Sequence, residues 1–344
     1  MERWLAGDDV PLDEVAASVR AWTPFAVDSP LYELFATRIA DDPDLLGVIA
    51  RIPTSPPINV LFAAVQRLLT ADDALAAWYP RLAGDARKPD ADAYTAFHDF
   101  VLAHREEILA LGRTRRTQTN EVRRCAVLMP VIADELARRG WDGPVHAIDM
   151  GASAGLGLLM DSVAYRYGDT RLGSSTLVVD SENRGGFPLP AAPPVFASRT
   201  GLDLSPVDAT DPDQAAWLEA LVWPEQADRL ERLRAAIALR REVDITMVPG
   251  DAAVTLPQVA AALPEGPIVL WHSIALYQLP DEALDAIDAS VARVAAERPL
   301  VRVAFEPQPG GGADIRVGLR PRETTPVATA HTHGAWIDAP LQET

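Results

Sequence analysis

The spacing of apolar residues changes near residue 140, and the two parts of the chain are expected to fold differently. Before this point apolar residues recur at helical spacing, as in the stripe Leu12, Val15, Ala16, Val19 and Trp22. After it, short apolar runs alternate with helical stretches, whereas the first part contains no alternating strand pattern. The sequence therefore predicts an all-helical cap domain over residues 1–140 and an α/β domain over residues 141–344.

Strands and helices alternate through the second part. The predicted strands are Val145–Met150, Val195–Leu204, Asp244–Val248, Ile268–Trp271, Leu300–Phe305, Asp314–Leu319 and Val327–His331, and the predicted helices are Asp213–Arg241, Thr255–Leu263 and Asp281–Glu297. This order favours a mostly parallel, Rossmann-like sheet with helices on both faces. The last two strands have no helix between them, so we expect an antiparallel C-terminal hairpin. Residues 168–194 form an insertion, in which Thr176–Asp180 and Gly185-Gly186 indicate a hairpin or a loop.

Composition limits the classes of partner. The chain has 344 residues and a net charge of −18, which repels phosphate backbones and anionic membranes. Its single cysteine, Cys125, fits a reducing compartment, and the segment Met1–Trp4 lacks the start of a signal peptide. No apolar run has the length that crosses a bilayer. We expect a cytoplasmic protein that acts on a small molecule and has neither nucleic acid nor membrane as a partner; its oligomeric state stays open.

The segment His146–Gly157 carries the strongest functional signal. Its apolar start predicts a buried strand, its small residues predict a tight bend, and Leu158 is expected to begin a helix. A bend before a helix N-terminus presents backbone N–H groups, and missing side chains let a ligand approach the main chain. Asp149 adds an acceptor at the end of the strand.

Three interpretations of this bend stay open. Gly151-Ala-Ser153-Ala-Gly155 matches the G-x-S-x-G nucleophile elbow of serine hydrolases, although no strands precede it and any partner, such as Asp251 or His331, is generic. The dinucleotide pattern G-x-G-x-x-G cannot be registered on the glycines of this segment. The third interpretation is a nucleoside-cofactor site.

The segment Asp149–Gly155 resembles the acid-x-Gly-x-Gly-x-Gly signature of class I S-adenosylmethionine-dependent methyltransferases. Ser153 stands where the middle glycine of that signature is found, so this residue must tolerate close approach of a ligand. The resemblance implies that Asp149, Gly151, Ser153 and Gly155 hold S-adenosylmethionine.

Two further segments fit the same resemblance. Thr200–Pro206 resembles the second motif, in which an acid at the strand end, here Asp203, binds the ribose hydroxyls; Asp208 is the substitute candidate. The segment Val248–Ala252 resembles the acidic position near the adenine amine, which implies a cofactor role for Asp251. The alternatives are that Asp203 caps a turn and that Asp251 is a helix N-cap.

Candidate catalytic residues follow the strand Ile268–Trp271. His272 and Tyr277 are expected near the reacting centre, with His272 as a general base or as a packed histidine, and with Ser273 beside them. Glu306 is a weaker candidate at the end of the next strand.

The polar segment before the helix at 122–136 offers ligands for a carboxylate. Asn120, Glu121, Arg123 or Arg124 faces the bend in one interpretation and solvent in the other. His331-x-His333 lacks an obvious third ligand, so no metal is expected.

The whole chain also resembles an uncharacterised bacterial family known only as a domain of unknown function. The resemblance rests on the segments Ser29–Tyr32, Gln118–Val122, Asp149–Gly155, Gly201–Asp203, Trp217–Glu225 and His272-Ser273. It implies no substrate. The sequence as a whole predicts a class I methyltransferase-like domain under a helical cap, with a serine hydrolase and a non-catalytic S-adenosylmethionine-binding protein as alternatives.

Overall fold

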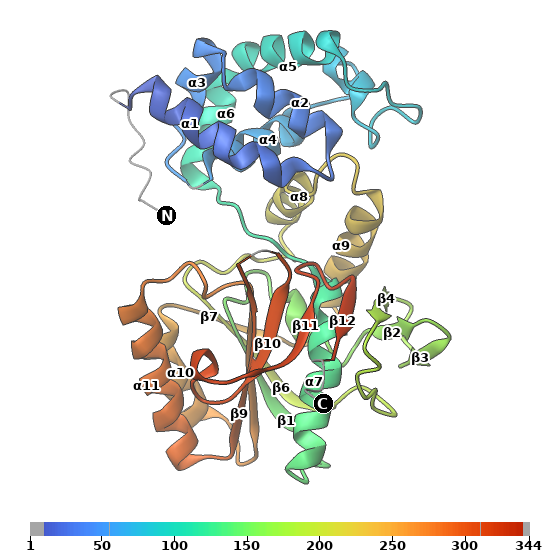
Figure 1. The fold of residues 1–344 in the computed structure, drawn as a ribbon, viewed down its shortest axis with the longest axis vertical. Coiled ribbons are helices and arrows are strands. Elements are labelled where there is room, and N and C mark those ends of the chain that lie inside the picture. Colours follow the sequence, from blue (N-terminus) through green and yellow to red (C-terminus); the bar gives the residue numbers. More distant parts are fainter. Residues whose placement is uncertain (1–9, 55, 310, 340–344) are drawn as a thin grey trace. The chain divides into compact units, whose positions relative to one another are not determined.

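A computed structural model of the chain describes residues 10–54, 56–309 and 311–339 (Figure 1). The chain divides into two compact units. A helical unit comprises Met1–Thr119 and Asp211–Glu231, and a sheet unit comprises Asn120–Thr210 and Arg232–Thr344. This division differs from a single cut at residue 140, because the segment after residue 120 joins the sheet unit and the segment after 211 returns to the helical unit.

The helical unit confirms the expected helices, and its described residues contain no strand. Its α-helices are α1 (Leu12–Trp22), α2 (Pro30–Ile39), α3 (Pro43–Ile49), α4 (Pro57–Leu68), α5 (Ala91–Ala103), α6 (Arg105–Thr114) and α8 (Pro212–Ala220). Side chains of Ser29, Asp42 and Asp90 cap α2, α3 and α5, which satisfies N–H groups that the first turn leaves unpaired.

Aromatic side chains fill the core of the helical unit. The rings of Tyr32 and Phe62 stack with centroids 4.1 Å apart, and those of Phe35 and Phe97 stack at 4.2 Å. Trp217 of α8 lies in the same core with 3% of its surface exposed. Its burial explains why a segment from the middle of the chain belongs to this unit.

The sheet unit contains a nine-stranded sheet in the order β5-β12-β11-β10-β9-β8-β1-β6-β7. Its strands are β1 (Val145–Met150), β5 (Glu182–Asn183), β6 (Phe196–Asp203), β7 (Thr246–Pro249), β8 (Ile268–Ser273), β9 (Leu300–Pro307), β10 (Ala313–Val317), β11 (Pro326–Ala330) and β12 (Trp336–Asp338). The five strands from β7 to β9 are mutually parallel. All seven predicted strands are therefore confirmed, and the sheet is mostly parallel as expected.

The predicted antiparallel hairpin is also confirmed. β10 pairs antiparallel with β11, and the connection holds a short 3₁₀ turn, η5 (Pro321–Glu323). The hairpin does not end the sheet, because β12 and β5 extend it further. β12 has three residues and β5 has two, which is too short for a period-2 pattern to be recognised in the sequence.

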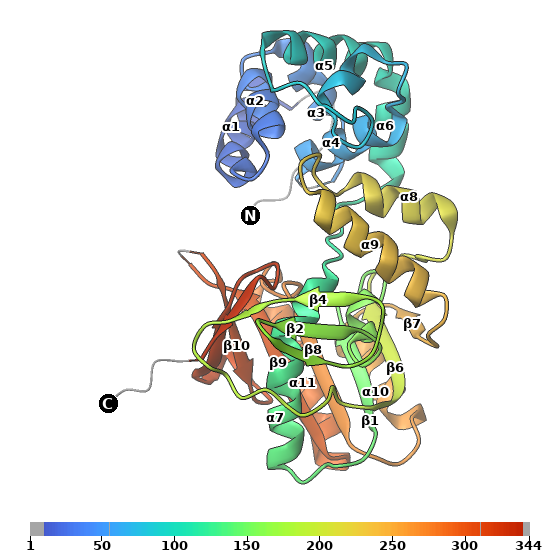
Figure 2. The same ribbon diagram turned by 90° about the vertical axis from the view of Figure 1, so that its right-hand side faces the viewer.

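The insertion forms a small sheet of its own. The strands β2 (Ala164–Tyr167), β3 (Thr170–Leu172) and β4 (Val178–Asp180) pair in the order β3-β2-β4, and Figure 2 shows them beside α7 (Cys125–Arg138). The helix expected at Leu158 is wrong: a 3₁₀ turn, η4 (Leu156–Leu159), follows the bend and leads directly into this small sheet. The leucines of η4 are buried, so their apolar run reflects burial rather than a helix.

Helices cover both faces of the large sheet. On one face α10 (Ala252–Ala262) and α11 (Asp281–Glu297) pack side by side over Ile148, Met150 and Leu202 (Figure 1). α7 covers the other face. The long helix predicted after β6 is divided into α8 and α9 (Ala227–Arg240). No helix of the described residues combines the length and the apolarity needed to cross a membrane.

Candidate functional site

The five parallel strands end at one edge of the large sheet, here called the carboxyl edge. From β1 the chain moves outward through β6 and β7 on one side, and later through β8 and β9 on the other. Ligands of open α/β sheets bind outside the strand ends at such a switch in strand order. Asp149, Asp203, Asp251, Ser273 and Glu306 stand at or just after these strand ends. The structure thus brings most of the predicted site residues to one edge.

The bend after β1 uses all of its backbone N–H groups within the sheet unit. These bonds run from Gly151 and Ala152 to the carbonyl oxygen of Leu202 (2.8 and 3.2 Å), from Ser153 to Asp203 Oδ2 (2.8 Å), from Ala154 to Asn120 Oδ1 (3.2 Å) and from Gly155 to the carbonyl oxygen of Ala152 (2.8 Å). A cradle for an anion needs N–H groups that point to the ligand. The N–H groups of Gly151 to Gly155 offer none, and the bend is followed by a 3₁₀ turn rather than by an α-helix.

The glycines of the bend make room for the protein rather than for a ligand. Gly151 has a φ of 76°, and a Cβ added there would lie 2.5 Å from Cβ of Ala275. A Cβ added at Gly155 would lie 3.0 Å from Sδ of Met247. The expectation that missing side chains leave the main chain open to a ligand is therefore not met at these two positions.

Asp203 is turned toward the bend, and its carboxylate joins two segments. Oδ2 accepts the N–H of Ser153 and Oδ1 accepts the N–H of Ser205, each at 2.8 Å. Each carboxylate oxygen can accept a further hydrogen bond. Asp203 is only partly buried, so this remaining capacity is within reach of a ligand. Asp208, the substitute candidate, instead accepts both the N–H and the hydroxyl of Thr210.

Asn120 reaches the bend, as one interpretation predicted. Its amide nitrogen donates to Ser153 Oγ at 3.0 Å, and its amide oxygen accepts the N–H of Ala154. Ser153 has a φ of 53°, a left-handed conformation that is unusual for a serine. Its hydroxyl contacts the Asn120 amide and not a histidine, which is the partner a serine nucleophile needs.

Asp149 is 5% exposed, and burial raises its pKa to about 8. The indole N–H of Trp271 and the charge of Arg124 act against this rise, whereas the nearby Asp203 carboxylate adds to it. A cation placed beside Asp149 would favour the ionised form. Without such a cation, burial favours the protonated form of Asp149.

His272 lies inside a buried polar network. Its Nδ1 is 2.5 Å from Glu306 Oε1, and its Nε2 accepts from the guanidinium of Arg302 at 3.2–3.3 Å. Burial first, and then the positive charge of Arg302, lower the pKa of His272. Because both ring nitrogens are engaged and 3% of the residue is exposed, a general-base role would require one of these bonds to open. The geometry favours the alternative of a packed histidine.

Glu306 holds the turn after β8. Although burial alone would raise its pKa, the hydrogen bond from His272 lowers it, so the carboxylate stays charged. It accepts backbone N–H groups of Ala275, Leu276 and Tyr277 at 3.1–3.3 Å. One signal of this network is present in the sequence, namely an arginine, Arg302, inside the apolar run of β9.

The rim of the carboxyl edge is partly apolar. Leu204 follows Asp203 and is 74% exposed, Val254 is 57% exposed and Tyr277 is 54% exposed. Each of these exposed side chains follows the end of a parallel strand, where ligands of open α/β sheets bind. Asp251 lies between them in sequence and caps α10 through the N–H of Ala253, which confirms the N-cap interpretation and leaves its cofactor role a prediction.

The two arginines of the polar segment bind main-chain oxygens. Arg123 Nε donates to the carbonyl oxygen of Asp180 at 2.7 Å. Arg124 donates to the carbonyl oxygens of Ser273 (3.2 Å) and Thr332 (2.9 Å), and it lies close enough to Asp149 to lower its pKa. The carboxylate of Glu121 forms an ion pair with Arg232 and accepts the backbone N–H of Arg123. Of this segment, Asn120 and Arg124 are the residues that the structure brings to the carboxyl edge.

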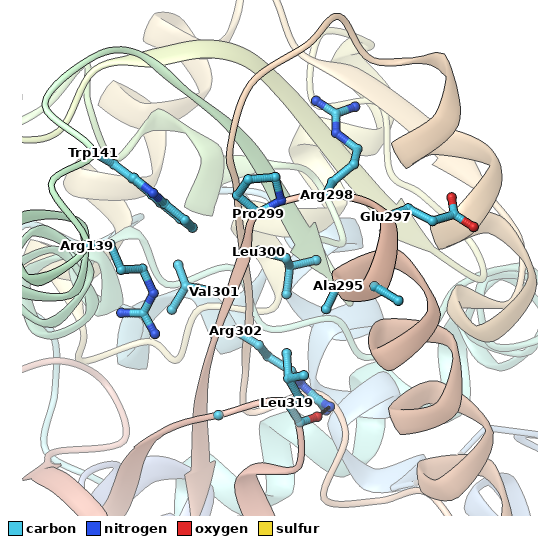
Figure 3. Close-up of a pocket in the computed structure, with 12 residues that line it drawn as sticks. Arg139, Trp141, Ala295, Glu297, Arg298, Pro299, Leu300, Val301, Arg302 and Leu319 are labelled. Atoms are coloured by element: carbon cyan, nitrogen blue, oxygen red, sulfur yellow. Dashed lines mark hydrogen bonds between the residues drawn. The ribbon is translucent and has the colours of Figure 1, made fainter.

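A cavity of about 670 Å³ lies at the opposite edge of the sheet (Figure 3). It surrounds the amino end of β9, between Trp141 and the last turn of α11. Its Arg298 donates to four carbonyl oxygens and its Arg302 belongs to the His272 network. None of the predicted site residues lines this cavity. The guanidinium groups of Arg298 and Arg302 already hydrogen-bond within the chain.

His331 and His333 lie close together, and the N–H of His333 donates to His331 Nδ1 at 3.0 Å. Within the described ranges, neither belongs to a group of three metal-ligand side chains.

These features define an α/β protein with an open, doubly wound sheet whose carboxyl edge carries acids and an apolar rim. The family model described as "Uncharacterized protein conserved in bacteria (DUF2332)" matches residues 18–339, and the chain belongs to this family. No curated protein matches the chain.

The segments that carry the family resemblance meet within each unit. In the helical unit, Ser29 Oγ donates to Glu225 Oε2 at 2.5 Å, and the N–H of Leu31 donates to Oε1 at 2.9 Å. In the sheet unit, Asn120 and Asp203 both bond to Ser153 of the bend. In each unit, the segments on which the family resemblance rests therefore contact one another.

Proposed function

We propose that the sheet unit binds S-adenosylmethionine at its carboxyl edge and transfers the methyl group to a small or medium-sized acceptor. The observation that carries this proposal is the chemistry of the edge. The N–H groups of Gly151 to Gly155 are all used within the chain, whereas acidic side chains stand at or just after three neighbouring strand ends, at Asp149, Asp203 and Asp251. Such an edge suits hydroxyl groups and positive charge, and it disfavours a pyrophosphate.

Individual residues fit parts of this cofactor. The unused acceptor capacity of Asp203 suits the two ribose hydroxyls, and the exposed Leu204 beside it offers an apolar surface for the base. Asp149 suits a positively charged group, because a nearby cation restores its ionised form. The residues present therefore fit a cationic nucleoside.

The bound sulfonium supplies an electrophilic methyl group, so alignment of the acceptor provides much of the acceleration. Tyr277 is the predicted catalytic residue best placed to contact an acceptor, because its side chain is half-exposed at the rim. Burial and the Glu306 charge raise the pKa of Tyr277, so the hydroxyl stays protonated and donates a hydrogen bond. Glu306 and His272 position Tyr277 through the turn that they hold.

Calorimetry tests the proposal with two ligands. The pure protein is expected to bind S-adenosylhomocysteine with one-to-one stoichiometry and not to bind NAD⁺, since the N–H groups of Gly151 to Gly155 are used within the chain. Absence of S-adenosylhomocysteine binding would end the proposal, and tight binding of NAD⁺ would replace it with a dinucleotide site.

A serine hydrolase remains the second candidate because Ser153 sits in the G-x-S-x-G pattern with a left-handed backbone. A fluorophosphonate probe distinguishes the two: a hydrolase is labelled at Ser153, and a methyltransferase is not. A non-catalytic binding protein would bind the nucleoside, and its ligand-dependent properties would not respond to Tyr277→Phe.

A further inference from the structure

Three metal-ligand side chains converge in the helical unit. Asp42 and Asp44 stand at the start of α3, and His98 lies on α5, which packs against α3 (Figure 1). Each residue offers one ligand atom, and the three atoms lie within 4.8 Å of one another. Only the fold brings them together, because more than fifty residues separate the aspartates from His98 in the sequence.

The imidazole of His98 lies between two carboxylates. Its Nδ1 is 3.1 Å from Asp99 Oδ1, and its Nε2 is 3.7 Å from Asp42 Oδ2. A neutral imidazole carries one N–H, so donation from Nδ1 to Asp99 leaves the Nε2 lone pair facing the Asp42 carboxylate. Two acceptors that face each other are stabilised by a cation between them, which is either a proton on Nε2 or a metal ion, and the third ligand atom, from Asp44, favours the metal ion. A carboxylate on the far nitrogen is also the arrangement that orients metal-binding histidines.

Asp42 is held in place by its other contacts. Oδ1 caps α3 by accepting the N–H groups of Asp44 (3.0 Å) and Leu45 (3.2 Å), and Oδ2 accepts the Tyr94 hydroxyl at 2.7 Å. Carboxylates that bind metals are commonly fixed by such hydrogen bonds. Asp44 is exposed, so its carboxylate can rotate toward the group without disturbing the cap.

We propose that Asp42, Asp44 and His98 bind a divalent transition-metal ion of the zinc type, with water completing its coordination, and that the ion links α3 to α5. One imidazole nitrogen and two carboxylate oxygens are ligands that zinc accepts. Ligands around tetrahedral zinc are about 3.4 Å apart at bond lengths of 2.0–2.1 Å, so a modest rotation of Asp44 closes the group. The site is independent of the methyltransferase proposal.

Calorimetry of the chelator-treated full chain with zinc chloride tests the site. One ion per chain is expected to bind, and the one-to-one transition is expected to disappear in His98→Ala and in Asp44→Asn, which keeps the helix cap. Asp99→Asn removes the orienting carboxylate and is expected to weaken binding about tenfold.

Two variants control for adventitious binding by other histidines. His104→Ala removes an imidazole beside Glu107 on the same unit, and His333→Ala breaks the His-x-His pair; both are expected to bind zinc like the wild type. A chain that binds no zinc, or that keeps its one-to-one binding in His98→Ala, overturns the proposal and leaves His98 as part of an ion pair.

Discussion

Asp149 shows how one buried side chain couples the stability of the sheet unit to pH. Its pKa is about 8 in the folded chain because of burial, against an ordinary value of 3.8. The folded state therefore keeps a proton that the unfolded state releases between these values. The protonated Asp149 therefore contributes fully to stability below the unfolded pKa. This contribution is lost progressively as pH rises from the unfolded pKa to the folded pKa. We expect this carboxyl to lower stability by at most about 1.4 kcal/mol per pH unit across that range.

The variant Asp149→Asn isolates the effect, because an amide cannot ionise. Urea unfolding is measured for both proteins between about pH 5 and 9. The variant is expected to gain stability relative to the wild type as pH rises, and the gain should level off near pH 8. Parallel stability curves for the two proteins would mean that Asp149 is not the group that loses its proton.

At the level of elements, the bend after β1 depends on the absence of side chains. Gly151→Ala places a methyl group against Ala275 in a left-handed backbone, so we expect a loss of about 2–4 kcal/mol from overpacking together with backbone strain. Gly168→Ala is the matched control, because Gly168 also has a positive φ but no atom within 4 Å of the added carbon. Its loss is expected to be about 1–2 kcal/mol. Equal losses in urea unfolding would show that the contact with Ala275 is unimportant.

The network between β8, β9 and α11 should behave as one unit. Arg302 donates to His272 Nε2, to Asp288 Oδ1 at 2.5 Å and to the carbonyl oxygen of Leu319. Arg302→Leu leaves the buried Asp288 without its main partner, so we expect a loss of about 3–5 kcal/mol in urea unfolding. Arg320→Leu removes an exposed ion pair with Glu323 in the same unit and should cost less than about 1 kcal/mol. Similar losses for both variants would contradict a stabilising role for the buried network.

For the whole molecule, the helical unit is built from two separate stretches of chain. Gln66 donates to the carbonyl oxygens of Ala220 (2.9 Å) and Val222 (2.7 Å), and Trp217 fills the aromatic core. Loss of a buried tryptophan alone costs about 3–5 kcal/mol, which is a large part of the 5–15 kcal/mol that stabilises a typical domain. A fragment of residues 10–119 is therefore expected to unfold without a cooperative thermal transition, and the same fragment joined to residues 211–231 is expected to show one by circular dichroism. Cooperative melting of the shorter fragment would contradict this division of the chain.

The sequence predicted the strands and helices themselves better than it predicted which elements pack against one another. The seven predicted strands were found from short segments rich in apolar residues between helices or turn residues, and the clearest case is the continuous apolar run at the start of Ile268–Ser273. The helix at Leu158 was wrong because a buried apolar run has the same composition in a helix and in a turn. The return of α8 to the helical unit could not be predicted, since it depends on contacts between residues about 150 positions apart, such as Gln66 and Ala220.

For the candidate site, too, the sequence predicted the positions of some residues but not the contacts that they make. The motif after β6 and the polar segment before α7 placed Asp203 and Asn120 near the bend, and both bond to it, while their cofactor roles stay predictions. The sequence could not indicate that the N–H groups of the bend are used within the chain, or that Arg302 occupies the free nitrogen of His272, because both depend on side chains from distant strands.

The central claim is that Asp203, at the tip of β6, binds the ribose of a nucleoside. Calorimetry with S-adenosylhomocysteine on the wild type, Asp203→Ala and Asp208→Ala tests it most directly. Asp203→Ala is expected to weaken binding by about 1–3 kcal/mol through the loss of hydrogen bonds to the two hydroxyls, with the fold verified by circular dichroism. Asp208→Ala is expected to bind like the wild type. Equal affinity in all three proteins, or no binding to the wild type, would contradict the claim.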